Sequence, residues 1–90
     1  MDRITVHPRI TRRHPDIQVA DVESAWRSAI AVRRRNYDPP EYYAAAGADS
    51  HGRLLEMVGV ELDDSSLLIF HAMRLTDKMA QELQVRREST

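Results

Sequence analysis

Apolar residues recur at helical spacing near the N-terminus and in short extended runs further along the chain. Between residues 18 and 30 the apolar positions follow the three- and four-residue spacing of one helix face: Val22, Ala25, Trp26, Ala29 and Ile30. Asp21 and Glu23 lie in the first turns, where a carboxylate interacts favourably with the positive end of a helix. The pattern predicts a helix over 18–30. Residues 29–35 either continue it or begin a strand, which the β-branched Val32 favours slightly.

The stretch before this helix predicts a second, shorter one. Residues 8–14 are expected to form one or two helical turns, because Pro8 suits a first helical position and Pro15 disfavours helix at His14. Residues 4–8 are either a short strand or an extended lead-in.

Three runs rich in apolar residues follow, at 41–47, 53–61 and 67–73, with turn residues between them. They predict an antiparallel meander, and Pro39 and Pro40 end the segment before it. Residues 76–85 predict a closing helix capped by Thr76 or Asp77, with frayed residues after it. The expected fold is α+β: two N-terminal helices, an antiparallel sheet of three to four strands and a C-terminal helix. It forms a single domain over 1–90, ordered from about 5 to 84.

The length of the turn at 62–66 decides which side chains share a face of the predicted sheet. A two- or four-residue turn places Val58 opposite His71 and Val60 opposite Ile69. The face expected to pack on the helices then carries Leu55, Met57, Gly59, Leu68, Phe70 and Ala72. The other face carries Glu56 and His71 as diagonal neighbours, ~7–8 Å apart at the backbone. A three- or five-residue turn would break this register, and an even-length loop at 48–52 would add Tyr43 beside Glu56.

Composition and charge exclude some classes of protein. The chain has no cysteine, which excludes disulfides and thiolate chemistry. It has no apolar stretch of ~18 residues and no signal-peptide core at its start, so we expect a cytoplasmic protein. Residues 1–35 hold eight arginines against four acids, and residues 36–90 hold five basic against ten acidic residues. The basic front part either offers a phosphate-binding face or simply keeps its helices solvated.

The polar residues of the predicted sheet suggest acid–base chemistry. Histidine titrates near neutrality, a nearby Glu56 can act as base or orient the ring of His71, and Arg74 at the strand exit can hold a phosphate. The alternative is a structural Glu–His pair. The four histidines show no metal-binding spacing, and the scattered glycines form no phosphate loop, so no metal or cofactor is expected.

Two stretches of the chain resemble the BrnT-like toxins of the RelE/ParE superfamily. The first is RRHPDIQVADVESAW, through Arg13, His14, Ile17, Asp21 and Val22; the second is GRLLEMVGVELDDSSLLIFHAMRLTDK, with its Gly–Arg–Leu–Leu strand, acidic turn and strand ending in an arginine. Together they span most of residues 8–80. Pro15 stands where the family usually has glycine, and the chain is mildly acidic where these toxins are typically basic.

The resemblance implies a RelE-like fold and the toxin of a bacterial type II toxin–antitoxin system, cleaving mRNA without a metal. The expected partners are RNA and a cognate DNA-binding antitoxin. On this sequence the implied catalytic residues are His71, Glu56 and Arg74, and the implied RNA-binding residues are Tyr43, Arg53, Lys78 and Arg35. The alternative is a non-catalytic protein-interaction module with the same fold.

Overall fold

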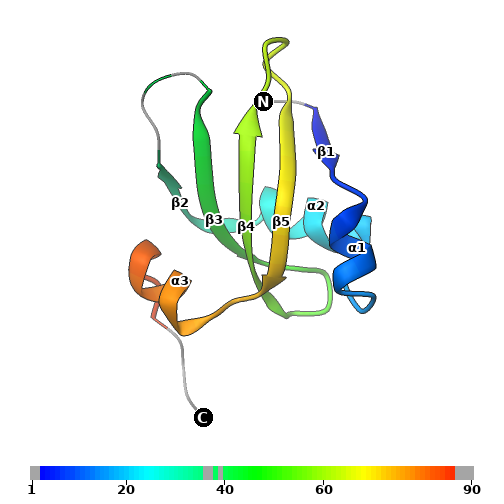
Figure 1. Cartoon of the computed structure of the whole chain (residues 1–90). Coiled ribbons are helices and arrows are strands. Elements are labelled where there is room, and N and C mark those ends of the chain that lie inside the picture. Colours follow the sequence, from blue (N-terminus) through cyan, green and yellow to red (C-terminus); the bar gives the residue numbers. More distant parts are fainter. Residues whose placement is uncertain (1–2, 36–37, 39, 87–90) are drawn as a thin grey trace.

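A computed structural model describes residues 3–35, 38 and 40–86 of the chain and builds them around one mixed sheet (Figure 1). In chain order the elements are β1 (Ile4–Val6), α1 (Arg9–Arg13), α2 (Val19–Arg27), β2 (Ala29–Arg34), β3 (Tyr42–Ala48), β4 (Leu54–Glu61), β5 (Leu67–Arg74) and α3 (Asp77–Leu83). The strands lie in the order β1-β5-β4-β3-β2.

The α+β class is confirmed, and so is the antiparallel meander of β3, β4 and β5. The predicted strand count is wrong, because the described sheet has five strands rather than three or four. Residues 29–34 leave the helix and pair antiparallel with β3, while β1 adds to the far edge, parallel to β5. A three-residue strand carries too little periodicity to be distinguished from a lead-in, and the pairing with β5 defines it.

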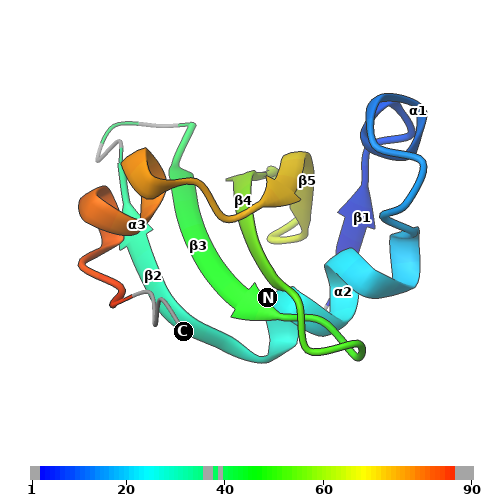
Figure 2. The ribbon, with the colours of Figure 1, turned by 90° about the horizontal axis from the view of Figure 1, so that it is seen from below.

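Helices cover both faces of the sheet (Figure 2). The main core lies on the α2 side, where Val22 and Ala25 pack with Leu55 and Met57 of β4. The second core lies on the opposite side and packs α3 onto β2 and β3; its buried residues are Ala44, Ala46, Val58, Leu75, Met79, Ala80 and Leu83. Helix α3 therefore covers the face that carries Glu56, opposite the face covered by α2.

The ends of the helices follow local chemistry. The Thr76 hydroxyl accepts a hydrogen bond from the backbone N–H of Met79, which caps α3 as predicted. Helix α2 ends at Arg27, three residues before the predicted limit, and its last turn lies very close to β3. A Cβ on Gly47 would stand 2.0 Å from the carbonyl oxygen of Ala25, so only glycine permits this approach.

The β4–β5 hairpin contains two irregularities that offset each other. Leu62 N–H bonds to the Ser66 carbonyl, which leaves a three-residue turn with Ser65 in the left-handed conformation at φ 68°. This turn shifts the pairing by one residue, so that Gly59 pairs with Ile69. A β-bulge at Phe70 then restores the register, and Val58 pairs with His71 as predicted.

The prediction of which β5 side chains face the main core is consequently right after the bulge and wrong before it. Leu55, Met57 and Ala72 lie in the main core as expected. Leu67 and Ile69 are fully buried there too, in the place predicted for Leu68 and Phe70. Phe70 instead packs against the second core. The three-residue turn is the cause, since a shift of one residue turns each side chain to the other face until the bulge corrects it.

Two predicted features fall mainly outside the described residues: the break near 36–40 and the frayed end at 87–90. None of the helices in the described ranges is long and apolar enough to span a membrane.

Candidate functional site

The bulge in β5 brings His71 and Glu56 together on the α3 side of the sheet. Because Phe70 is the extra residue, Phe70 and His71 both line the same cavity instead of alternating across the sheet. The imidazole Nε2 of His71 lies 2.9 Å from the Oε2 atom of Glu56. The predicted proximity of these two residues is therefore confirmed, and the contact is a direct hydrogen bond.

Glu56 is buried and fully engaged. Its Oε1 atom accepts hydrogen bonds from the backbone N–H of Thr76 at 2.9 Å and from the Thr76 hydroxyl at 2.6 Å. Burial alone would raise the pKa of Glu56, but the bonds from Thr76 and His71 lower it below its ordinary value. The carboxylate is therefore ionised at neutral pH and accepts hydrogen bonds only, so Nε2 of His71 carries the proton of this bond.

This assignment leaves Nδ1 as the unprotonated nitrogen of a neutral His71 ring. The side chain is 37% exposed and lines a cavity of about 580 Å³ between α3 and the sheet. The carboxylate thus fixes the orientation of the ring and leaves a nitrogen that can accept a proton.

Three cations line this cavity with the dyad: Arg9 from α1, Arg35 just after β2 and Lys78 from α3. The remaining lining residues are Tyr42, Glu56, Val58, Phe70, His71, Thr76, Met79 and Glu82. Basic groups can bind phosphate, and aromatic rings can stack on bases.

Two of the cations are held in place by the protein itself. Arg35 donates through Nε to Glu82 at 2.7 Å and through a terminal nitrogen to the other carboxylate oxygen. This bond lowers the pKa of Glu82 below its ordinary value. Arg9 donates to the Phe70 carbonyl at 3.1 Å, and its guanidinium lies 5.9 Å from the centre of the Phe70 ring.

The structure brings four of the seven predicted site residues to this cavity, namely His71, Glu56, Lys78 and Arg35. Arg74 is exposed at the end of β5, where it pairs with Leu55, a residue of the main core. Side chains alternate along β5 between His71 and Arg74, so Arg74 lies on the α2 side and not beside the dyad.

Tyr43 lies on the wrong face for the predicted contact. Ala48 pairs with Leu54, which leaves an odd, five-residue loop between β3 and β4 and turns Tyr43 toward the main core. Its hydroxyl donates to Glu41 at 2.7 Å. The neighbouring Tyr42 lines the cavity instead and meets the Phe70 ring edge-on, at 6.1 Å between ring centres.

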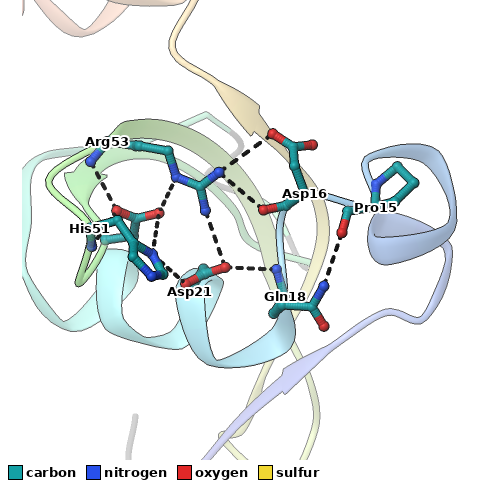
Figure 3. Close-up of polar contacts among 7 residues, drawn as sticks. Pro15, Asp16, Gln18, Asp21, His51 and Arg53 are labelled. Carbon is teal, nitrogen blue, oxygen red and sulfur yellow. Dashed lines mark hydrogen bonds and ion pairs between the residues drawn. The ribbon is translucent and has the colours of Figure 1, made fainter.

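Arg53 lies in a separate network that ties the loop after β3 to the start of α2 (Figure 3). Its Nε donates to Asp49 at 2.8 Å and one terminal nitrogen to Asp21 at 3.2 Å, while the other bonds to the Asp16 carbonyl. Burial would raise the pKa of Asp49, but the hydrogen bonds from Arg53 and His51 lower it overall. The position of Arg53 fits a structural role better than the predicted phosphate contact.

The same network contains the described group with the right atoms for a metal ion, Asp21, Asp49 and His51, whose ligand atoms lie within 4.8 Å of one another. The Arg53 guanidinium already pairs with both carboxylates, and its positive charge would repel a metal ion placed beside it.

The site residues that were not predicted include Arg9, Tyr42 and Thr76. Arg9 belongs to a basic segment that the sequence does reveal, but only the packing of α1 against β5 selects it from among its neighbours. Thr76 was expected as a helix cap, and its second role, holding Glu56, has no sequence pattern of its own.

Comparisons of the chain with protein-family models, with curated proteins and with solved structures found no match.

Proposed function

We propose that this cavity binds RNA and that His71 cleaves it as a general base without a metal ion, as the toxin of a bacterial toxin–antitoxin pair would. The observation that supports the proposal is the His71–Glu56 pair, 2.9 Å apart, in a cavity that also contains three cations. The earlier resemblance to BrnT-like toxins of the RelE/ParE superfamily points to the same chemistry.

The proposed reaction is a transphosphorylation within the RNA. The 2′-hydroxyl gives its proton to Nδ1 of His71, and the 2′-oxygen forms a bond to the adjacent phosphorus. The bond from phosphorus to the 5′-oxygen breaks, and that oxygen takes a proton from water. The hydroxide left behind takes the proton from Nδ1 of His71, which restores the neutral ring. The products are a 2′,3′-cyclic phosphate and a free 5′-hydroxyl, and the three cations stabilise the charge on the phosphate as it develops.

Glu56 has a narrower role here than the sequence suggested. An ionised, buried carboxylate cannot supply a proton, so Glu56 positions His71 and does not act as the acid. Arg74 has no part in this proposal, because its side chain lies on the other side of the sheet.

Cleavage of a labelled single-stranded RNA in the presence of a chelator tests the proposal. We expect His71→Ala to lower the rate by ~10²–10⁴-fold, the usual contribution of a general acid–base group. The matched control is His51→Ala, which removes an exposed histidine from the Arg53 network, away from the cavity. Mass spectrometry should find the cyclic phosphate, and a 2′-O-methyl RNA of the same sequence should remain intact.

The toxin role has its own test. Induced expression should arrest bacterial growth, His71→Ala should relieve the arrest, and the product of a neighbouring short gene should form a stable complex with the chain. Normal bacterial growth during induced expression of the wild-type chain, together with no RNA cleavage in the assay, would reject the proposal.

A second function, that of a non-catalytic interaction module, is favoured by one observation. Glu56 binds both donor groups of Thr76 and so anchors α3 to the sheet, which gives the dyad a structural purpose without catalysis. A wild-type chain that cleaves RNA no faster than His71→Ala, at the background rate, would select this function.

A further inference from the structure

A second cavity continues the first toward α1. It has a volume of about 400 Å³ and shares three lining residues with the first cavity, Arg9, Phe70 and His71. Seen along the strands, α3 and α1 stand at opposite ends of the sheet, with the ends of β4 and β5 between them (Figure 2). The two cavities therefore form one groove that runs from α3 across the bulge of β5 to α1.

Basic groups line this groove from end to end. Lys78 and Arg35 lie at the α3 end, Arg9 lies where the two cavities meet, and Arg13 and His14 line the α1 end. The acidic groups that line it are Glu56 and Glu82. Both accept hydrogen bonds from within the protein, Glu56 from Thr76 and Glu82 from Arg35.

The α1 end has an arginine available for a ligand. No hydrogen bond or ion pair joins the Arg13 side chain to another residue in the described ranges, and Arg13 is exposed. Arg12 precedes it in the same helix, is equally exposed and lines neither cavity. The helix thus directs Arg13, and not Arg12, to the groove. The sequence alone does not show which of the two adjacent arginines faces it.

We infer that Arg13 of α1 forms a second phosphate subsite, which binds a single-stranded nucleic acid at a phosphate other than the one beside His71. The aromatic rings of Tyr42 and Phe70 along the groove favour a single strand, because only unpaired bases can stack on side chains. This inference rests on the proposed function, since it uses the same groove. It adds that a long ligand binds more tightly than a short one and that Arg13 makes the extra contact.

Binding of uncleavable 2′-O-methyl RNA of two lengths tests the subsite. NMR titration suits the weak binding of a short oligonucleotide of about three nucleotides, alongside one of about nine. For wild type the longer ligand should bind severalfold more tightly. Arg13→Ala should remove most of this length advantage and reduce the slope of log K against log salt by about 0.7 for the longer ligand alone. Arg12→Ala is the matched control and should leave both lengths unchanged.

Equal losses from Arg12→Ala and Arg13→Ala would overturn the subsite, because they would indicate attraction by the overall charge of α1. Equal affinity of wild type for both lengths would overturn it as well. These outcomes are separate from failure of the proposed function: if the length advantage depends on Arg13 but no RNA is cleaved, the subsite stands and the catalytic proposal fails.

Discussion

At the residue scale, the contacts of Glu56 give it two roles that a single carboxylate rarely combines. One oxygen holds the start of α3 through Thr76, and the other orients His71. Both roles require an ionised group, and the hydrogen bonds themselves maintain that state by keeping the pKa of Glu56 below its ordinary value despite burial.

Glu56→Gln should therefore destabilise the protein in a pH-dependent way. A group whose pKa is lowered on folding stabilises the protein above its unfolded pKa, and this contribution is lost as pH falls through the folded value. We expect a loss of roughly 1.5–3 kcal/mol at pH 7, since hydrogen bonds to charged groups contribute about that much. The difference from wild type should shrink below about pH 4.

Urea unfolding at several pH values measures this effect. Glu61→Gln, in the same strand but more exposed, is the control and should cost little at any pH. A Glu56→Gln variant with the same deficit at pH 3 and pH 7 would contradict the account.

Substitutions at Arg53 and Lys78 should have different effects, one on the stability of the fold and the other on RNA affinity. Arg53→Ala leaves the buried carboxylates of Asp49 and Asp21 without their cation, so it should lower the unfolding midpoint clearly while RNA affinity is kept. Lys78→Ala, on the exposed side of the cavity, should lower affinity with little loss of stability. Denaturant unfolding and RNA titration of both folded variants check this, and a loss of affinity in Arg53→Ala equal to that in Lys78→Ala would return Arg53 to the binding site.

At the element scale, the turn and the bulge of the β4–β5 hairpin set which side chains reach the cavity. The three-residue turn alone would have left His71 on the main-core face, and the bulge at Phe70 returns it to the side of Glu56. A β-bulge beside a candidate site is a common way to aim a side chain.

This register predicts different losses for two neighbouring residues of β5. Ile69→Ala should cost roughly 2–4 kcal/mol, because Ile69 is fully buried and its removal leaves a cavity. Phe70→Ala should cost clearly less despite its larger side chain, because Phe70 is only half-buried at the edge of the groove. Urea unfolding of both variants measures the difference, and a larger loss from Phe70→Ala would argue against the bulge.

At the scale of the whole molecule, the Arg35–Glu82 pair connects the last helix to the end of the edge strand, and both residues line the groove. Glu82 also accepts a bond from Arg33 through its backbone carbonyl, so α3 is attached to β2 at two points. A phosphate that binds Arg35 must compete with the Glu82 carboxylate.

Glu82→Gln should consequently increase RNA affinity severalfold and steepen its salt dependence, by at most about 0.7 in the slope of log K against log salt. Glu41→Gln is the matched control: it removes the same charge from the partner of Arg34 but lies outside the groove. RNA titration at several salt concentrations provides the measurement. Equal gains from both variants would show that net charge, and not release of Arg35, controls binding.

The sequence by itself determined the elements whose signals are local: the helix that begins near Asp21, the strands 41–47 and 53–61, the Thr76 cap and the α+β class. Periodicity and capping depend on neighbouring residues, so they can be read along the chain. The pairing of Glu56 with His71 was predicted as well, but the structure reaches that register through a three-residue turn and a compensating bulge, not through the two- or four-residue turn on which the count relied.

Only the tertiary structure decided which residues surround that pair. Because the loop before Leu54 has an odd number of residues, Tyr42 and not Tyr43 lines the cavity. Because α1 packs against β5, Arg9 and Arg13 line the groove and Arg12 does not. Arg53 instead bonds to the nearby Asp49 carboxylate and, in a distant segment, to the Asp16 carbonyl and the Asp21 carboxylate. Each choice depends on parity or on contacts between segments far apart in the chain, and a one-residue change reverses it without altering the local pattern of the sequence.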